Sequence, residues 1–294
     1  MLTKKRGIFI VIFLLIAPSS AYFFINRFGT MPAVDFDVSM QSSLYKICLE
    51  QPYNKESYEF FKSYYIKNSP HKVKVQKEPL IPKKLHWIWL GSPLPEKYSA
   101  HIQSWIEKHP DWEYKIWTEA DVDDFKLINK DLFDASPNYG EKSDIWRYEI
   151  LERFGGVYID IDQECLKPFD VLHHMYHFYV GLQSLDTTCV QIGISLIGAI
   201  PHHIILKQCV KHLRNNQDRR EIIARTGPLF FTTICLAIMD KSSLCNIVFP
   251  ASYFFPCGYN QKGQPRSLWI KPESYAVHHW AGSWLEPTSF VPRQ

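Results

Sequence analysis

Asp160 and Asp162 follow a double glycine and are the residues best suited to chemistry in this sequence. In the alternating run 157–162 they share one face with Tyr158, and a rise of about 3.3 Å per residue places them about 6.6 Å apart. Two anions this close repel each other unless a cation lies between them. Such oxygen ligands suit hard divalent cations, so the pattern favours Mg²⁺ or Mn²⁺.

A helix of about three turns is expected just before these carboxylates. Ser143 is a suitable N-cap and Gly155 a suitable C-terminal stop. At about 100° per residue, Asp144 and Arg147 lie inside the apolar face of this helix. Two charges there need partners, either each other in an internal ion pair or a ligand that needs one acceptor, the carboxylate, and several donors, the guanidinium N–H groups. The residues alone leave both alternatives open.

Strand-like and helix-like segments alternate from residue 81 onward. The strand-like segments are 85–90 and 114–117, and the helix-like ones are 96–109 and 120–127. Alternation of this kind predicts an α/β fold with a mostly parallel central sheet flanked by helices. Because these sheets bind ligands at the carboxyl ends of their strands, the Asp160 region should lie at such an edge.

The amino terminus resembles a membrane anchor. Three cations at positions 4–6 precede the uncharged run 7–25, which as a helix spans roughly 28 Å, close to the thickness of the hydrocarbon layer. This predicts a single-pass protein with its catalytic part on the non-cytoplasmic side. Small residues at 18–21 also suit cleavage of a signal peptide, which would give a secreted protein.

Three regions are therefore expected. Residues 1–27 form the basic flank and transmembrane anchor, residues 28–80 a helical stem, and residues 81–294 the catalytic domain. The stem is expected because apolar and aromatic residues recur at helical spacing on both sides of a break near Pro52.

Charge and cysteine content exclude two classes of protein. The chain has 33 Lys and Arg against 30 Asp and Glu, and four of these cations precede Asp35, so the rest is near neutral and does not fit a general nucleic-acid binder. None of the 7 cysteines forms a Cys-x-x-Cys pair, so the sequence does not suggest a zinc ribbon or a thioredoxin-like site. Disulfides and buried thiols both remain open.

Taken together, three segments resemble a known family. The run 143–162 is similar to the sugar-binding region of glycosyltransferases with the DXD motif. These are relatives of fungal initiating α-1,6-mannosyltransferases and mannosyl-inositol-phosphorylceramide synthases, and more distantly of clostridial glucosylating toxins. Residues 81–91 resemble the family's first strand, and residues 275–284 its C-terminal motif. The resemblance implies a GT-A-like nucleotide-sugar-binding fold over about 81–284.

The resemblance also implies a set of site residues. Donor binding falls to Trp89, Asp144, Arg147, Tyr158, Ser283 and Trp284, and metal binding to Asp160, Asp162 and His278. Trp89 would stack on the base, while Ser283 and Trp284 would close over the donor. Where the family often has a polar residue facing the sugar, this sequence offers Gln191 and Ser195.

His278 is preferred to His279 on the family pattern. Neighbours on an extended strand point to opposite faces, so only one of the two imidazoles can face the site.

The implied activity is metal-dependent transfer of a hexose from a nucleotide-diphosphate sugar to a lipid or glycan acceptor, with retention at the anomeric carbon. The fungal relatives suggest mannose, and glucose and galactose remain open. The compartment would be the lumen of the Golgi or endoplasmic reticulum if the source is eukaryotic. A nucleotide-sugar hydrolase and a catalytically silent, membrane-tethered binding protein are the alternatives.

Overall fold

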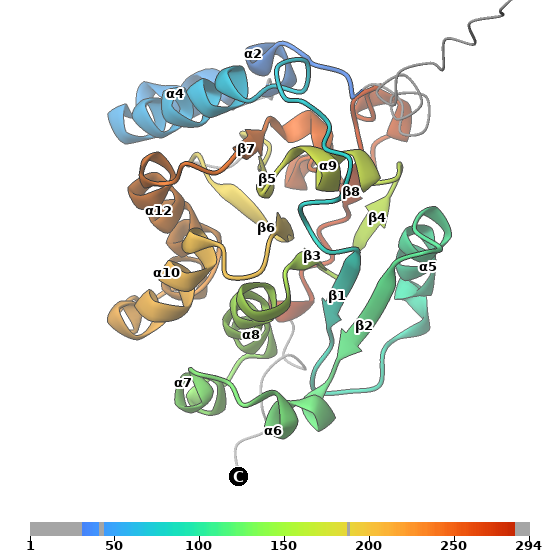
Figure 1. Ribbon diagram of the computed structural model, residues 1–294. Coiled ribbons are helices and arrows are strands. Elements are labelled where there is room, and N and C mark those ends of the chain that lie inside the picture. The colour runs from blue at the N-terminus through green and yellow to red at the C-terminus, as the bar shows by residue number, and fades with distance from the viewer. Residues whose placement is uncertain (1–30, 41–43, 187–188, 286–294) are drawn as a thin grey trace, which may run out of the picture. The chain divides into compact units, whose positions relative to one another are not determined.

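The computed structural model describes residues 31–40, 44–186 and 189–285, which belong to one compact unit, Met31–Gln294. The predicted transmembrane segment lies outside the described residues. Figure 1 shows a twisted central sheet with helices on both sides. The expectation of an α/β fold is confirmed.

Six strands form the main sheet. Their order across the sheet is β2 (Glu113–Trp117), β1 (Lys84–Ile88), β3 (Gly156–Ile159), β6 (Ile192–Ala199), β5 (Phe178–Leu182) and β7 (Asn246–Phe249). β1 pairs in parallel with β2 and β3, and β5 pairs in parallel with β7. Only β6 runs against its two neighbours, so the sheet is mostly parallel, as predicted.

A small second sheet connects distant parts of the chain. β4 (Gln163–Cys165) pairs antiparallel with β8 (Ala276–His278), and Gln163 lies opposite His278. This pairing places the C-terminal residues beside the segment that follows β3.

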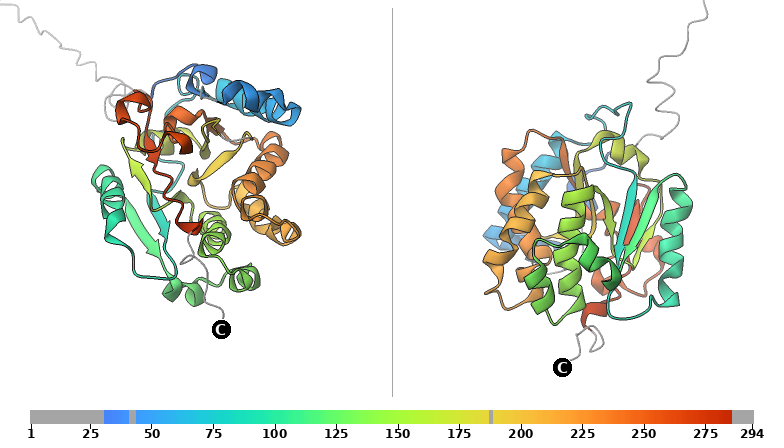
Figure 2. Two further views of the ribbon diagram at one scale, coloured as in Figure 1. Left: turned by 180° about the vertical axis from the view of Figure 1, so that it is seen from behind. Right: turned by 60° about the horizontal axis from the view of Figure 1, so that its bottom comes forward.

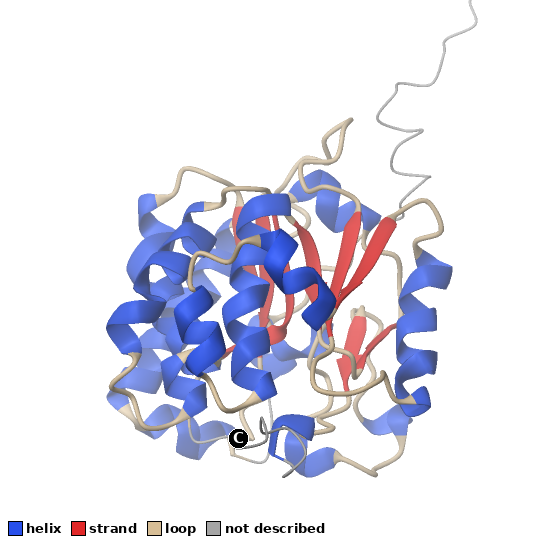
Figure 3. Cartoon of the chain, turned by 90° about the horizontal axis from the view of Figure 1, so that it is seen from below, coloured by secondary structure: helices blue, strands red, loops and turns tan. Residues whose placement is uncertain are grey.

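Helices cover the sheet from both sides (Figures 2 and 3). α12 (Pro228–Ile238) contacts β6, while α10 (Ile204–His212) contacts both α12 and α8 (Tyr139–Phe154). α5 (Ser99–Lys108) lies against β4. The remaining described α-helices are α2 (Phe36–Met40), α3 (Tyr45–Glu50), α4 (Pro52–Lys67), α6 (Val122–Phe125), α7 (Lys130–Ala135), α9 (Asp170–Met175) and α11 (Ile222–Arg225).

The helices expected in the region 28–80 are present and pack on the sheet. α4 contacts β7. Tyr64 Oη donates to Asp240 Oδ1 at 2.7 Å, and Asn68 Nδ2 donates to the carbonyl of Asn246 at 2.8 Å. Residue 80 therefore does not separate two compact units, and a role of residues 28–80 as a stem stays a prediction.

One helical stretch in the described residues, Ile222–Lys241, is long and apolar enough to cross a membrane by length and composition. It contains α12, whose Phe231 and Cys235 are fully buried. Because α12 packs against β6, we assign this stretch to the core.

Most cysteines of the described chain are buried thiols. Cys48, Cys165, Cys209, Cys235 and Cys257 are buried, and neither they nor Cys245 form a disulfide. The sequence left open whether the cysteines form disulfides or remain thiols, and these six residues remain thiols.

Candidate functional site

A cavity of about 930 Å³ opens at the carboxyl ends of β1 and β3. All of the predicted site residues except Arg147 line it, namely Trp89, Asp144, Tyr158, Asp160, Asp162, His278, Ser283 and Trp284. The cavity therefore lies at the carboxyl ends of the strands, which is the edge of the sheet where the sequence predicted the Asp160 region.

The double glycine brings β3 close to β1. Gly155 and Gly156 have φ angles of +61° and +92°, which residues with a Cβ rarely adopt. A Cβ on Gly156 would lie 2.6 Å from the carbonyl oxygen of Lys84. The tight turn predicted at this point is confirmed, and it positions the strand that leads to the carboxylates.

α8 begins earlier than predicted. Its N-cap is Asn138, whose Oδ1 accepts the backbone N–H of Glu141 at 3.1 Å. The prediction of Ser143 as the cap is wrong, because Ser143 Oγ instead donates to the carbonyl of Tyr139 at 2.9 Å within the helix. Gly140 is needed in the added turn, since a Cβ there would lie 2.5 Å from the Cβ of Trp284.

β3 ends at Ile159, so the prediction of one strand through residue 162 is also wrong. Asp160 still donates its N–H to the carbonyl of Ser195 at 2.7 Å, but Gln163 N–H then closes a turn onto the carbonyl of Asp160 at 3.0 Å. The turn brings the two carboxylates and His278 together, with one ligand atom from each within 4.8 Å of the others.

Asp162 forms an ion pair with His278. Its Oδ1 lies 3.2 Å from His278 Nε2, and its Oδ2 accepts the N–H of Ala281 at 2.7 Å. Burial alone would raise the pKa of Asp162, but the charge of His278 and the hydrogen bonds from His278 and from the N–H of Ala281 together outweigh it and hold this pKa below its usual range. Burial would lower the pKa of His278, but the charge and hydrogen bond of Asp162, with the charge of Asp160, together raise it.

Arg147 lies behind the cavity wall and is only 4% exposed. Its Nη2 is 2.8 Å from Asp144 Oδ1, and its Nη1 is 3.1 Å from Asp160 Oδ1 and 2.7 Å from the carbonyl of Ile194. The guanidinium also lies 4.3 Å from the centre of the Tyr158 ring. The structure therefore does not bring this expected donor-binding residue to the cavity surface. Arg147 fixes Asp144 and Asp160 instead.

Asp144, the partner of Arg147 on α8, lines the cavity. Thr226 Oγ1 donates to Asp144 Oδ2 at 3.0 Å. Burial raises the pKa of Asp144, and the charge of Arg147 and the hydrogen bond from Thr226 oppose that change. The apolar-face placement predicted for Asp144 and Arg147 is confirmed, and it produces a buried ion pair that also borders a cavity.

Several cavity residues gave no signal in the sequence. They are Tyr98, Tyr139, Gln183, Ile222, Ile223 and Tyr259. Each lies in a loop or near a helix end far along the chain from the Asp-x-Asp segment, so no local pattern connects them to it. The ring of Tyr98 lies 5.5 Å from that of Trp89 and is tilted against it, a contact that could be recognised only once the loop after β1 was known.

The two polar residues noted in the segment after residue 190 have different positions. Gln191 lines the cavity and donates through Nε2 to Gln183 Oε1 at 2.7 Å. Ser195 also lines the cavity but donates its hydroxyl to Gln163 Oε1 at 2.8 Å. Both therefore border the space expected for a sugar.

His279 belongs to a different cluster, on the other face, as the strand pattern predicts. His101, Glu164 and His279 each offer a ligand atom within 4.8 Å of the others. Arg266 already binds Glu164 through two hydrogen bonds of 2.8 and 2.9 Å, and His279 Nε2 lies 2.9 Å from the same carboxylate. Burial raises the pKa of Glu164, but these partners lower it to about 2. We assign this cluster to the support of the β4–β8 pair.

The residues around Asp160 fit a divalent cation. Two carboxylates and one imidazole converge there, and such sets suit Mn²⁺ and Mg²⁺ when water or a ligand supplies further oxygens. Within the described residues, His278 Nδ1 is a buried nitrogen without a hydrogen-bond partner. The side chain of Asp160 is 28% exposed and remains accessible from the cavity.

Comparison with known proteins agrees with this chemistry. Residues 95–179 match the family described as "Glycosyltransferase sugar-binding region containing DXD motif". The chain is 32% identical over 161 residues to inositol phosphoceramide mannosyltransferase 2 of Schizosaccharomyces pombe, which covers 52% of this chain and 45% of the relative. It is 29% identical over 190 residues to mannosyl phosphorylinositol ceramide synthase SUR1 of Saccharomyces cerevisiae, covering 60% and 48%.

The chain spans about half the length of these two curated relatives. Among solved structures, the PaToxG glycosyltransferase aligns with a TM-score of 0.46 and 19% identity over 65% of this chain and 80% of that protein. The family resemblance predicted from the sequence is confirmed. The chain contains a glycosyltransferase sugar-binding region that includes the Asp-x-Asp segment.

Proposed function

We propose that this chain is a metal-dependent glycosyltransferase that moves a hexose from a nucleotide-diphosphate sugar to an acceptor. The convergence of Asp160, Asp162 and His278 on the wall of one cavity is the observation that most supports this proposal. The matched DXD region, which contains both aspartates, supports the same reaction class.

The donor would lie along the cavity with its base at the β1 end. Trp89 and Tyr98 offer aromatic faces for the base. The diphosphate would lie beside Asp160 and Asp162, and Ser283 and Trp284 would cover it. Asp144 and Gln191 border the space left for the sugar hydroxyls.

Asp160, Asp162 and His278 would hold the cation. A bound Mn²⁺ or Mg²⁺ neutralises the charge that develops on a leaving diphosphate. Arg147 contributes indirectly, because its Nη1 fixes the orientation of Asp160. We do not expect it to touch the phosphates.

We further propose a front-face displacement with retention. Asp144, Asp160 and Asp162 are the only carboxylates on the described cavity wall. The first is bound to Arg147 and Thr226, and the other two belong to the cation cluster. None is therefore available as a covalent nucleophile, and the departing phosphate oxygen would take the proton of the acceptor hydroxyl. A glycosyl-enzyme adduct on any of these three would contradict this mechanism.

The acceptor and the location are proposed from the named relatives and the N-terminal sequence. Two relatives are named as enzymes that add mannose to inositol phosphoceramide or form its mannosylated product, so GDP-mannose and such a lipid are the first pair to test. Glycan acceptors remain a second class. Anchoring through residues 1–27, with the cavity on the lumenal side, would place the site near membrane lipids.

A thermal-shift screen tests the donor. GDP-mannose, UDP-glucose and UDP-galactose are added with and without Mn²⁺, and a donor that binds the folded state raises the melting temperature. Asp162→Asn should abolish the Mn²⁺-dependent shift, which is measured against the variant's own metal-free melting temperature, because loss of the buried pair with His278 is expected to lower that temperature.

Asp124→Asn is the matched control, because Asp124 is exposed on α6, away from the cavity lining. A Mn²⁺-dependent shift that survives in Asp162→Asn would contradict the proposed site. Release of free hexose with no transfer to any lipid or glycan would favour a hydrolase. Absence of any turnover despite donor binding would favour a silent binding protein.

A further inference from the structure

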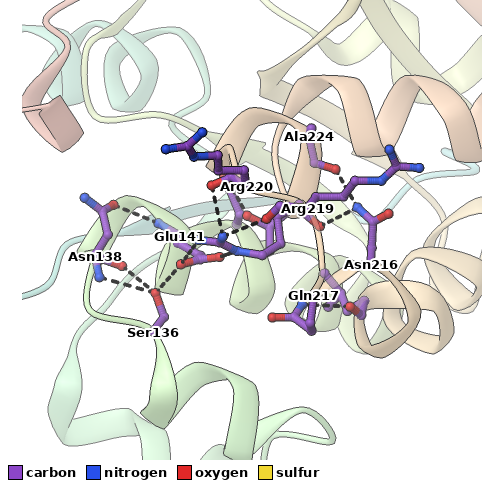
Figure 4. A network of polar contacts seen from close by, with 12 residues as sticks. Ser136, Asn138, Glu141, Asn216, Gln217, Arg219, Arg220 and Ala224 are labelled. Atoms are coloured by element: carbon purple, nitrogen blue, oxygen red, sulfur yellow. Dashed lines mark hydrogen bonds and ion pairs between the residues drawn. The ribbon is translucent and has the colours of Figure 1, made fainter.

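A polar network connects the start of α8 to the segment before α12 (Figure 4). Its centre is an ion pair between Glu141 and Arg225, whose side chains are 4% and 19% exposed. Arg225 donates through Nε to Glu141 Oε1 and through Nη2 to Oε2 at 3.0 Å. Its Nη1 also donates to the carbonyls of Arg219 and Arg220, at 2.9 and 3.4 Å. The guanidinium of Arg225 therefore binds both α8, through Glu141, and the loop that contains Arg219 and Arg220.

On the α8 side, the network reaches the C-terminal segment 282–285, which we call the strap. Ser136 Oγ donates to Glu141 Oε2 at 2.6 Å. Asn138, the N-cap that accepts the N–H of Glu141, donates through Nδ2 to the carbonyl of Trp284 at 2.9 Å. The strap lines the cavity, so one side of the ion pair supports one cavity wall.

On the other side, Arg225 ends α11, which forms a second wall. Ile222 and Ile223 of this helix line the cavity. The next residue, Thr226, donates its hydroxyl to Asp144 Oδ2. Asn216 Nδ2 donates to the carbonyl of Arg225 at 3.0 Å and so fixes the same segment from outside. Neither Glu141 nor Arg225 lines the cavity, yet Glu141 is bonded to the N-cap that contacts the strap, and Arg225 belongs to the helix that forms the other wall.

We propose that Glu141 and Arg225 are positioning residues that hold the α11 wall and the strap together around the bound donor. This inference rests on the proposed transferase activity. A closed wall keeps water from the reacting carbon, so the pair favours transfer to the acceptor over hydrolysis of the donor. The forked contact gives the pair a defined geometry, and loss of either partner leaves a poorly solvated charge.

Limited proteolysis tests the positioning directly. Arg219 and Arg220 are exposed trypsin targets whose backbone carbonyls are held by Arg225. Cleavage follows the population of the open segment, so Arg225→Met should accelerate cleavage after these two residues by about tenfold or more. Arg214→Met is the control, because the exposed pair of Arg214 with Asp131 does not touch this segment.

A double variant separates positioning from simple destabilisation. Glu141→Gln combined with Arg225→Met removes both charges, so its melting temperature should recover relative to Arg225→Met alone. Cleavage after Arg219 and Arg220 should nevertheless stay fast, because their carbonyls still lack the Nη1 donor. Recovery of slow cleavage in the double variant would show that only the unpaired charge mattered, and would overturn the inference.

The ratio of free to transferred hexose is the functional readout. Partial unfolding lowers both products equally, whereas a loosened wall admits water and should raise this ratio severalfold in Arg225→Met. If the wild-type protein transfers hexose and the variant shows unchanged cleavage and an unchanged ratio, the inference fails while the proposed function stands. If the wild-type protein turns over no nucleotide sugar, the proposed function fails, and the role in excluding water fails with it.

Discussion

Arg147 is predicted from the sequence to bind a ligand, but in the structure its guanidinium forms ion pairs with two neighbouring carboxylates. Its side chain is buried between Asp144 on α8 and Asp160 after β3. Because both carboxylates border the cavity, their orientation depends on a cation that does not itself line the cavity. Sequence patterns identify such a residue as part of the site, but only the fold distinguishes a direct contact from a supporting one.

Replacement of this arginine should be costly. Arg147→Met leaves two carboxylates without their shared cation, and loss of one partner from a buried pair typically costs about 3–5 kcal/mol of unfolding free energy. Urea denaturation measures this change. Arg214→Met, which removes an exposed pair, should change stability little. A loss of stability no larger than that of the control would show that Arg147 is not the support described here.

At the level of elements, the double glycine determines how closely β1 and β3 approach. The peptide at Gly156 lies against the backbone of Lys84, where no side chain fits. Since β1 carries Trp89 just beyond its end and β3 carries Asp160, their spacing sets the width of the cavity between the expected base and cation positions.

Gly156→Ala should therefore destabilise the fold by roughly 2 kcal/mol or more. Gly263→Ala is a matched comparison, because Gly263 has a similar φ of +83° but no atom within 4 Å of the added Cβ. Both variants carry the cost of a positive φ, about 1 kcal/mol. The difference between their urea midpoints therefore isolates the steric clash. Equal midpoints would mean that β3 can shift without cost.

The elements that the sequence predicted correctly are those specified by neighbouring residues. The apolar face of α8, the glycine turn and the opposite orientations of His278 and His279 follow from helical and strand periodicity. The N-cap at Asn138 does not follow from periodicity, although its bond to the N–H of Glu141 is a local one. The contacts of Asn138 with Trp284 and of Asp160 with Ser195 exist only after distant segments meet. The α11 wall was missed for the same reason.

At the level of the whole molecule, buried neutral histidines make stability sensitive to mild acid. Burial lowers the pKa of His86 and of His203 to about 4, from an ordinary value of 6.5. His86 lies against the carbonyl of Gly155, and His203 against Asn246. The unfolded chain therefore binds more protons than the folded chain between pH 6.5 and 4, and stability is lost as the pH falls through that window.

Because each of these histidines is protonated more readily in the unfolded chain, each should lower the free energy of unfolding by about 2 kcal/mol between pH 7 and pH 5. Urea midpoints at the two pH values measure the loss. His86→Gln should have a smaller difference between pH 7 and pH 5 than the wild-type protein, because one titrating group is removed. Glu164 does not interfere, since its lowered pKa acts only below about pH 4.5. Asp144 acts in the opposite direction in this window, because its raised pKa of about 7 lets the folded state bind the extra proton, but it is present in both proteins. An equal difference between pH 7 and pH 5 in His86→Gln and in the wild-type protein would therefore contradict the assignment.

The pairing of β4 with β8 has a consequence for biosynthesis. Asp162 emerges from the ribosome long before His278, and closing so long a loop is slow and entropically costly. A nascent chain that has made the first residue but not the second holds two mutually repelling aspartates without their imidazole neighbour. On the proposed function, competence to bind cation and donor is thus acquired only after His278 has been made, so chains that stop before this residue should not consume nucleotide sugar.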